Sequence, residues 1–219
     1  MYKLLILDLD GTIANTSDAI REAANLALRH FGHPEHDAAS FAACLGGGSF
    51  SFMGKSLPPQ ARTEEHIREA VAEFWRNYDV TYIHTDRTYP GVDTAIAALH
   101  AKGIRIAVLS NKREYMTKPL IEQLIPGIAS PVVGRRADIP AKPDPTAALA
   151  IAAECGCTPN EVAFVGDTDS DMETAHRAGF LAVGVAWGYQ SPERLREAGA
   201  DVILETPADL LAYFTGDSQ

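Results

Sequence analysis

The amino-acid sequence predicts an α/β protein in which helices flank a parallel sheet and a helical cap is inserted after the first strand. Two observations support this class. From residue 89 onward, short aliphatic runs alternate with helical patterns, and such alternation is typical of a parallel sheet. Between the first aliphatic run and residue 89 the patterns are helical. We therefore expect a core of residues 1–14 and 87–219 and a cap of residues 15–86.

The composition limits what the protein can bind. The 219 residues are 46% hydrophobic and 22% charged, which is ordinary for a globular protein with a sizeable core. The formal net charge of −10 argues against nucleic acid or an anionic membrane as a partner, because both require basic surfaces. Asp8 and Asp10 interrupt the apolar start of the chain, and no apolar run is long enough to span a membrane. We expect a cytoplasmic protein, either a monomer or a homodimer.

Residues 4–12 (LLILDLDGT) contain the first candidate site. The aliphatic run predicts a strand that is buried on both faces. Because strand side chains alternate between faces, Asp8 and Asp10 are expected to project to the same side. Neighbouring carboxylates repel each other unless a cation lies between them, and Mg²⁺ prefers oxygen ligands of this kind. Gly11 allows a sharp change of backbone direction and the close approach of a ligand to the main chain.

The inserted region contains two amphipathic helical patterns joined by a glycine-rich segment. The first pattern covers residues 17–31, and the second places Ile67, Phe74 and Tyr78 on one stripe. Residues 38–45 look helical, and residues 44–56 are expected to form a flexible loop that holds three glycines at 46–48 and also Lys55. That loop resembles a phosphate-binding P-loop, but it lacks the first glycine of the motif and no buried strand precedes it. We expect a helical hairpin that serves as a lid.

The rest of the chain predicts the remaining strands, several of which end in polar residues. An aliphatic run at 104–109 leads into Ser110, Asn111 and Lys112, and a run at 162–165 leads into an acidic segment. Lys142 precedes a proline and is expected in an extended turn outside the following helix. The further expected elements are a helix from Val92, a helix with Pro119 in its first turn or at a kink, a weak strand at 130–134, a helix ending near 154, strands at 181–185 and 201–204, and short helices after Pro192 and Pro207.

These polar groups are expected to meet at one edge of the sheet. Ligands of an open parallel sheet bind beyond the carboxyl ends of its strands. The candidate groups are carboxylates for a metal, a hydroxyl with backbone amides, and one lysine, and this combination suits phosphoryl transfer. The residues concerned are Asp8, Asp10, Ser110, Asn111, Lys142, Asp167 and Asp171.

With these motifs in this order, the chain resembles the haloacid dehalogenase superfamily along essentially its whole length. The matching pieces are the segment that begins at Asp8, the strand that ends at Ser110, Lys142 with its Pro-Asp-Pro sequence, and the acidic segment from Gly166 to Asp171. The nearest subgroup resembles the phosphoglycolate phosphatases, which insert a helical cap after the first strand of a Rossmann-like core. The resemblance therefore implies the same α/β, Rossmann-like architecture.

The resemblance also implies roles for individual residues. Asp8 would be the nucleophile that forms an aspartyl-phosphate, and Asp10 would be the general acid and base. Ser110, the Asn111 amide and Lys142 would hold the phosphoryl oxygens, which Gly11 lets approach the main chain.

The metal and substrate contacts implied by the resemblance complete the expected site. The Asp8 carboxylate, the Asp10 carbonyl and Asp167 would bind Mg²⁺, with Asp171 direct or through water. Lys55 in the cap is a candidate partner for a substrate carboxylate.

The function expected from this site is Mg²⁺-dependent hydrolysis of a small phosphorylated metabolite similar to phosphoglycolate. A sugar-phosphate mutase of the β-phosphoglucomutase type is the main alternative, because its core would be the same. A phosphonate hydrolase is less favoured, because such enzymes replace the acid at the position of Asp10. They use a cap lysine as a Schiff base, and Lys55 is a weak candidate for that role. A regulator that only binds phosphorylated metabolites is less favoured because Asp8 and Asp10 are both present.

Overall fold

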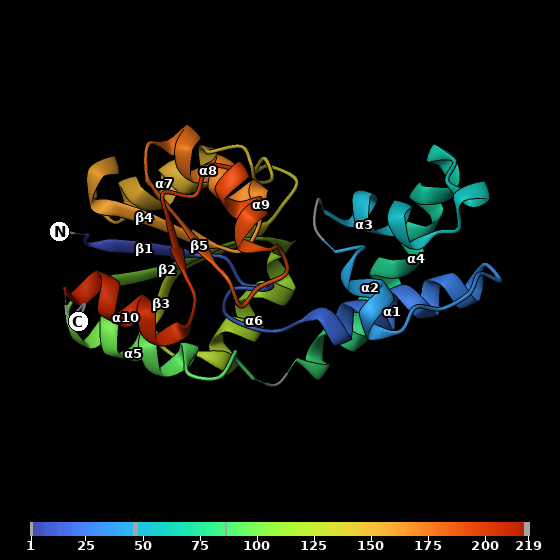
Figure 1. Ribbon diagram of the computed structural model, residues 1–219, viewed down its shortest axis with the longest axis horizontal. Helices are drawn as coiled ribbons and strands as arrows, with labels where there is room; N and C mark the ends of the chain where they lie inside the picture. Colours follow the sequence, from blue (N-terminus) through green and yellow to red (C-terminus); the bar gives the residue numbers. More distant parts are fainter. Residues whose placement is uncertain (1, 46–47, 86, 217–219) are drawn as a thin grey trace. The chain divides into compact units, whose positions relative to one another are not determined.

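The computed structural model describes residues 2–45, 48–85 and 87–216, and the chain forms two compact units (Figure 1). One unit comprises Met1–Asn15 and Asp86–Gln219, and the other comprises Thr16–Thr85. Among the described residues, no helix is both long and apolar enough to cross a membrane.

The larger unit is built on a six-stranded parallel sheet with the strand order β3-β2-β1-β4-β5-β6. The first strand lies in the middle of the sheet, where Leu7 pairs with Val108 on one side and Val165 on the other. Its carboxyl end is therefore a position where the strand order changes direction, which is the usual ligand position in such sheets. The strands are β1 (Leu4–Leu7), β2 (Arg105–Arg113), β3 (Ala129–Arg135), β4 (Val162–Gly166), β5 (Leu181–Val185) and β6 (Val202–Leu204).

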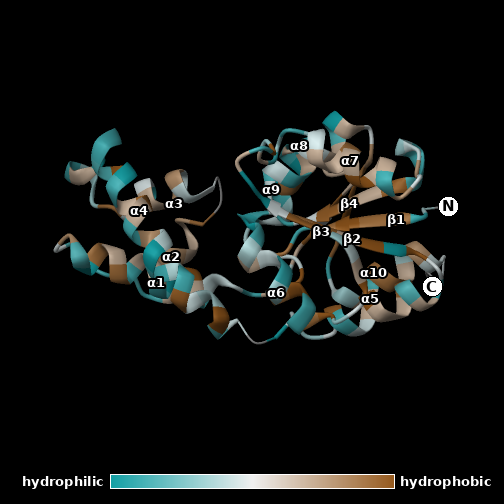
Figure 2. Ribbon diagram, turned by 180° about the vertical axis from the view of Figure 1, so that it is seen from behind, coloured by the Kyte–Doolittle hydropathy of each residue, from teal (hydrophilic) through white to brown (hydrophobic). Residues whose placement is uncertain are grey.

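Two apolar layers cover the two faces of this sheet. Leu5 and Leu7 belong to one buried cluster, while Leu4 and Ile6 belong to the other, as the alternation of a strand requires. Figure 2 shows the hydrophobic colour concentrated in the central strands. The first face packs against α5 (Val92–Ala101), α6 (Glu114–Leu124) and α10 (Pro207–Thr215), and the second against α7 (Thr146–Glu154), α8 (Asp169–Ala178) and α9 (Pro192–Glu197).

Three details of the larger unit differ from the expected elements. Strand β2 continues through Ser110 to Arg113, instead of ending at residue 109, because it keeps pairing with β3. Pro119 lies inside α6 rather than in its first turn. Helix α8 was not among the expected elements; it begins inside the acidic segment, where Thr168 and Asp171 form a capping box.

The smaller unit is helical, and its two longest helices pack against each other. These are α1 (Ser17–His30) and α4 (Glu64–Thr81). Between them lie α2 (Ala38–Ala42) and α3 (Gly48–Ser56), and two short 3₁₀ turns, η1 (Pro59–Ala61) and η2 (Tyr82–His84), complete the unit. Phe74 of α4 packs edge-to-face against Phe52 of α3, which joins the elements into one aromatic core.

The expected flexible loop at residues 44–56 is wrong for its second half. Residues from Gly48 onward form α3, because Phe52 and Met53 are buried and anchor a helical turn against the rest of the unit. Gly54 lets α3 approach α4, since an added Cβ would lie 3.2 Å from Cδ1 of Ile67. Two of the three expected loop glycines, at 46–47, lie outside the described residues. The connection between α1 and α4 is therefore partly helical, and the unit is not a simple hairpin.

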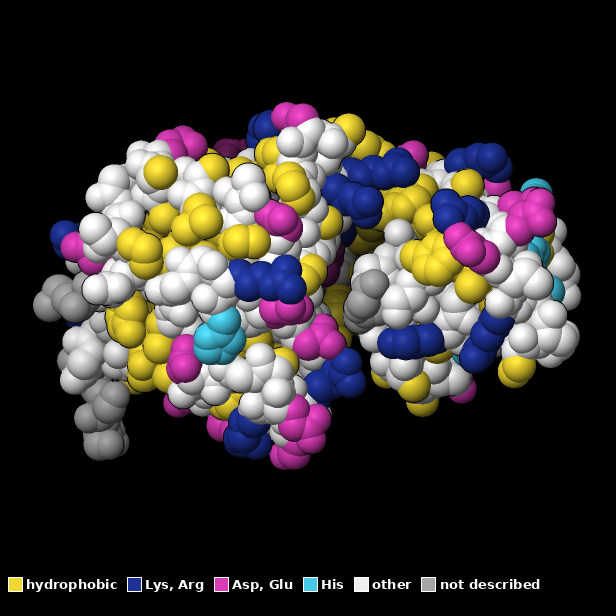
Figure 3. Space-filling view, turned by 90° about the horizontal axis from the view of Figure 1, so that it is seen from above, with side chains coloured by type: hydrophobic (Ala, Val, Ile, Leu, Met, Phe, Trp, Pro, Cys, Tyr) yellow, Lys and Arg dark blue, Asp and Glu magenta, His cyan; other side chains and the backbone are white. Residues whose placement is uncertain are grey.

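The surface charge of each unit is mixed. On the face of the molecule in Figure 3, described basic side chains are scattered among acidic ones. Several exposed basic side chains of the described residues form ion pairs within a helix, such as Arg68 with Glu64 and Lys118 with Glu114. Such pairs contribute little to stability.

Candidate active site

The turn after β1 places Asp8 and Asp10 at the edge of the sheet. The Asp8 amide donates to the Val165 carbonyl at 2.9 Å, which keeps this residue in the sheet. The chain then turns tightly, and Ile13 donates back to the Leu9 carbonyl at 3.0 Å. Gly11 has a φ of +92° in this turn, a conformation that glycine adopts without the steric cost of a Cβ.

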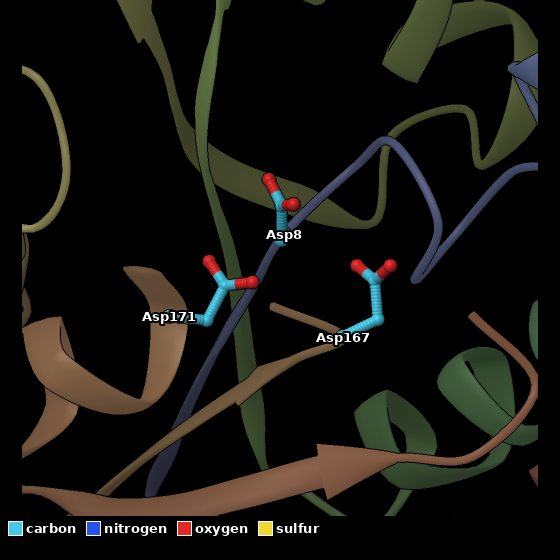
Figure 4. A group of neighbouring side chains, drawn as sticks. All are labelled: Asp8, Asp167 and Asp171. Atoms are coloured by element: carbon cyan, nitrogen blue, oxygen red, sulfur yellow. The ribbon is translucent and has the colours of Figure 1, made fainter. Parts of the chain in front are cut away.

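Three carboxylates converge beside this turn. Asp8 follows β1, Asp167 follows β4, and Asp171 lies in the first turn of α8; Figure 4 shows the three groups facing one region. Each offers an oxygen atom within 4.8 Å of the others, and all three residues are buried. Parallel pairing of β1 with β4 brings the two strand ends together, so the fold itself creates this concentration of negative charge.

Lys142 lies between two of these carboxylates. Its Nζ atom donates to Oδ1 of Asp171 at 2.6 Å and lies 2.8 Å from Oδ1 of Asp8. This contact pairs the ammonium of Lys142 with the buried carboxylate of Asp8. The other oxygen of Asp171 accepts from the amide of Thr168 at 3.0 Å and from its hydroxyl at 2.6 Å. Two hydrogen bonds therefore engage Oδ2 of Asp171, whereas its Oδ1 accepts one, from Lys142.

Asn111 fixes the backbone of Lys142. Its side-chain carbonyl accepts from the Lys142 amide at 2.9 Å, and its side-chain NH₂ donates to the Lys142 carbonyl at 3.1 Å. This double hydrogen bond ties the end of β2 to the turn before α7. The expected contact of Asn111 was its backbone amide; the side-chain contact depends on a residue 31 positions away, which the local sequence does not reveal.

Asp167 is held by groups that lie far apart in the sequence. Its Oδ1 atom accepts from the hydroxyl of Thr12 at 3.0 Å, and its Oδ2 atom accepts from the amide of Tyr189 at 2.8 Å. An added Cβ at Gly11 would lie 2.1 Å from Oδ2 of Asp167, and one at Gly188 would lie 2.1 Å from its Cβ. Both positions therefore require the absence of a side chain.

The electrostatics of the cluster favour added positive charge. Burial raises the pKa of Asp8 to about 7; Lys142 opposes this shift and Asp171 increases it. Burial also raises the pKa of Asp167 well above its ordinary value, and the carboxylates of Asp171 and Asp8 raise it further. Burial alone would lower the pKa of Lys142, but Asp171 and Asp8 outweigh burial and raise it. Lys142 therefore stays protonated, and its single charge does not balance three carboxylates.

The residues fit a hard divalent cation. Asp8 presents a buried carboxylate that pairs with Lys142, and each oxygen of Asp167 accepts one hydrogen bond, which leaves lone pairs on both carboxylates. An all-oxygen donor set of carboxylates is typical of Mg²⁺ sites.

The remaining expected site residues differ from one another in burial and in the groups that they contact. Ser110 is buried within β2, where its hydroxyl accepts from the Lys112 amide at 3.2 Å and keeps its own proton to donate. The Asp10 side chain is 21% exposed and pairs with Lys112, a residue to which the sequence interpretation gave no role. Lys55 is exposed on α3 of the smaller unit, and its expected substrate contact stays a prediction.

The chain belongs to the haloacid dehalogenase-like hydrolase family, whose model matches residues 2–179. This finding confirms the expected superfamily and a hydrolase as the enzyme class. The α/β fold class is confirmed by the sheet itself and by solved structures of the same fold.

Within that family, the chain is similar over nearly its full length to proteins named phosphoglycolate phosphatase. It is 30% identical over 210 residues to one from Aquifex aeolicus, covering 95% of each chain. It is 28% identical over 217 residues to one from Mannheimia succiniciproducens, covering 96% of this chain and 97% of the relative. A solved structure of a predicted phosphoglycolate phosphatase from Haemophilus somnus matches with a TM-score of 0.85 and 27% identity, covering 97% of this chain and 98% of the other.

Proposed function

We propose that the protein is a Mg²⁺-dependent phosphatase that hydrolyses small phosphomonoesters similar to 2-phosphoglycolate through an aspartyl-phosphate on Asp8. The buried group of Asp8, Asp167 and Asp171 around Lys142, at the carboxyl end of the central strand, is the observation that carries this proposal. The full-length similarity to phosphoglycolate phosphatases supports the substrate class.

In the first step, a carboxylate oxygen of Asp8 attacks phosphorus. A new bond forms between this oxygen and phosphorus while the bond from phosphorus to the ester oxygen breaks. The electron pair of the broken bond stays on the ester oxygen, which takes a proton from Asp10 and leaves as an alcohol. Asp8 is suited to attack because its amide holds it in the sheet and the Lys142 ammonium beside it favours the ionised, nucleophilic form.

In the second step, water attacks the phosphorus of the aspartyl-phosphate. Asp10, now a carboxylate, accepts a proton from that water, and the bond between Asp8 and phosphorus breaks. The electron pair returns to the Asp8 carboxylate, and inorganic phosphate is released. Lys142 and the Ser110 hydroxyl would hold the phosphoryl oxygens and compensate the charge that develops in both steps.

Asp8, the Asp10 carbonyl and Asp167 would hold Mg²⁺, which supplies charge compensation at the phosphoryl group when bound. Asp171 would contribute directly through Oδ1, which accepts one hydrogen bond from Lys142, or through a water molecule.

A sugar-phosphate mutase would use the same core, and phosphate release distinguishes the two activities. The experiment measures inorganic phosphate from a panel of small phosphomonoesters with Mg²⁺, with β-glucose 1-phosphate included and its isomerisation followed in parallel. We expect phosphate release with the highest kcat/KM on 2-phosphoglycolate or a similarly small ester. Isomerisation without phosphate release would favour the mutase, and no turnover of any phosphomonoester would contradict both activities.

Asp8→Asn tests the covalent route in the same assay. We expect loss of turnover, because the amide is a poor nucleophile and a weaker metal ligand. Asp169→Asn is the matched control: Asp169 lies in the acidic segment between Asp167 and Asp171 but pairs with Arg194 at 2.7 Å, so this variant is expected to keep its activity. Phosphate release by Asp8→Asn at the unmodified rate would contradict the proposal.

A further inference from the structure

A buried lysine contacts the residue assigned to proton transfer. The Nζ atom of Lys112 donates to Oδ1 of Asp10 at 3.0 Å, across 102 positions of the sequence. The Lys112 side chain is 1% exposed, whereas that of Asp10 is 21% exposed. Burial of a lysine is costly unless its charge is compensated, so this arrangement requires a partner such as Asp10.

The backbone on both sides of this contact is fixed. The Lys112 amide donates to the Ser110 hydroxyl at 3.2 Å, and the Lys112 carbonyl accepts from the Thr117 hydroxyl at 3.2 Å. On the other side, Asp10 lies in the tight turn that is closed by a hydrogen bond of 3.0 Å from the Ile13 amide to the Leu9 carbonyl. The ion pair therefore joins two rigid segments, and its geometry does not depend on a mobile side chain at the surface.

The contact uses one carboxylate oxygen of Asp10 and thereby orients the other. A carboxylate is planar, so a donor fixed on Oδ1 determines the direction of Oδ2. The exposed part of the Asp10 side chain faces solvent, from which a substrate must enter. A general acid has to lie within hydrogen-bond distance of the atom that it protonates, and an oriented Oδ2 meets this requirement more often than a freely rotating one.

We propose that Lys112 is a positioning residue that orients Asp10 for proton transfer to the leaving group. The inference rests on the proposed function, in which Asp10 is the proton donor. When Asp10 gives its Oδ2 proton to the ester oxygen, it becomes a carboxylate beside the Lys112 ammonium. The electron pair of the broken bond from phosphorus to oxygen becomes the lone pair that takes this proton, and the negative charge left on Asp10 is compensated by Lys112.

This role predicts an effect that depends on the leaving group. An alkyl phosphate needs a proton on its ester oxygen as the bond breaks, because an alkoxide is a poor leaving group. A 4-nitrophenolate leaves without protonation, so 4-nitrophenyl phosphate needs no oriented acid in this step. The value of kcat/KM reports steps up to the first irreversible one, which is formation of the aspartyl-phosphate.

The experiment compares kcat/KM for ethyl phosphate, 2-phosphoglycolate and 4-nitrophenyl phosphate with saturating Mg²⁺. Lys112→Met removes the ammonium but keeps an unbranched chain. We expect kcat/KM of this variant to fall at least about tenfold on both alkyl phosphates and less than about threefold on the nitrophenyl ester. The larger loss would be part of the rate enhancement that a general acid contributes. Asp10→Asn should show the same selectivity. Lys118→Met is the control, because Lys118 pairs with Glu114 on the surface of α6 and is 55% exposed; it should leave all three values unchanged.

Two results would overturn the positioning role. An equal loss on all three substrates would mean that Lys112 supports the phosphoryl group or the fold. A loss on 2-phosphoglycolate alone would mean that Lys112 binds the substrate carboxylate. If Lys112→Met does not fold, Lys112→Gln is measured instead; it keeps a neutral donor, and we expect a smaller loss with the same selectivity. Failure of the proposed function can be distinguished from failure of the positioning role. In that case the unmodified protein would release no phosphate, or Asp10→Asn would show no leaving-group selectivity.

Discussion

At the scale of single residues, the candidate site depends on glycines as much as on charged groups. Asp167 lies between Gly11 and Gly188, and a Cβ at either position would lie 2.1 Å from an atom of Asp167. The hydroxyl of Thr12 and the amide of Tyr189 then determine the directions of its two oxygens. Replacing a residue that orients a metal ligand typically lowers metal affinity by about 10–100-fold.

We expect Gly188→Ala to weaken Mg²⁺ binding by about 10–100-fold, because Asp167 must move away from the new methyl group. The measurement is the Mg²⁺ concentration that gives half-maximal phosphate release. Gly54→Ala is the control, since its new Cβ would meet only the flexible end of Ile67 at 3.2 Å. An unchanged Mg²⁺ requirement in Gly188→Ala would show that the position of Asp167 does not determine metal affinity.

The pKa of Asp8 predicts how stability depends on pH without metal. Its folded value of about 7 exceeds its ordinary value of 3.8, so the folded state binds this proton more tightly than the unfolded state. Asp8 therefore contributes to the free energy of unfolding below about pH 4. This contribution, on the order of 1–4 kcal/mol, is lost as the pH rises through about 7. The raised pKa of Asp167 acts in the same direction.

Because Mg²⁺ would bind the ionised carboxylates, we expect it to raise the Tm more at pH 8 than at pH 5. Thermal unfolding at both pH values, with chelator and with Mg²⁺, measures this difference. A larger stabilisation at pH 5 would contradict the assignment of Asp8 and Asp167 as metal ligands.

At the scale of elements, the site depends on a bond between β2 and the turn before α7. The side chain of Asn111 makes two hydrogen bonds to the backbone of Lys142. Without them, the ammonium group of Lys142 would still contact Asp8 and Asp171, but its backbone would lose both hydrogen bonds to Asn111. The smaller unit contains a similar arrangement, in which the Asn25 side chain makes two hydrogen bonds to the backbone of His36.

We expect Asn111→Ala to lower both stability and kcat, because it frees the Lys142 backbone. The loss in the free energy of unfolding should be about 1–3 kcal/mol, and kcat should fall by about tenfold or more. Asn25→Ala removes the same pair of bonds in the smaller unit and should cost similar stability with a smaller change in kcat. Denaturant unfolding and phosphate release are measured for both variants. Equal kcat values would show that Lys142 keeps its place without Asn111.

At the scale of the whole molecule, the smaller unit is inserted in the sequence shortly after the turn that holds Asp8 and Asp10. Ala14, four residues after Asp10, forms a β-bridge with Thr88, so the chain leaves the larger unit and returns to it at one place. This connectivity motivates the hypothesis that the inserted helices act as a lid that excludes water and limits substrate size.

We expect kcat/KM for 2-phosphoglycolate to exceed that for a phosphopeptide by at least about 100-fold, because a lid that closes leaves room for a small organic group. The comparison is made across phosphomonoesters of increasing size, with Lys55→Ala alongside and Lys118→Ala as its control. Equal efficiency on the phosphopeptide would contradict the lid hypothesis. An unchanged KM of Lys55→Ala for 2-phosphoglycolate would contradict the proposed contact of Lys55 with the substrate carboxylate, but not the lid hypothesis.

The sequence by itself determined the parts of the protein that depend on local pattern. A buried aliphatic run predicts a strand, and the order of helical and aliphatic segments predicts a parallel sheet, so the fold class follows without coordinates. Polar residues directly after such runs, as at Asp8, Ser110 and Asp167, are placed at one edge by the fold class alone. The pattern was less informative at residues 48–56, where a glycine-rich composition suggests a loop but burial of Phe52 stabilises a helix.

Only the tertiary structure decided which of these groups touch. The contacts of Lys112 with Asp10, Thr12 with Asp167, and Asn111 with Lys142 join residues 31 to 155 positions apart. Each depends on strand register and on the direction of a turn, and neither is encoded in the residue types at the two ends. Burial likewise determines the pKa of Asp8. A carboxyl group of this type has an ordinary pKa in water, but burial raises the pKa of Asp8 to about 7. This desolvation requires the whole fold around the group.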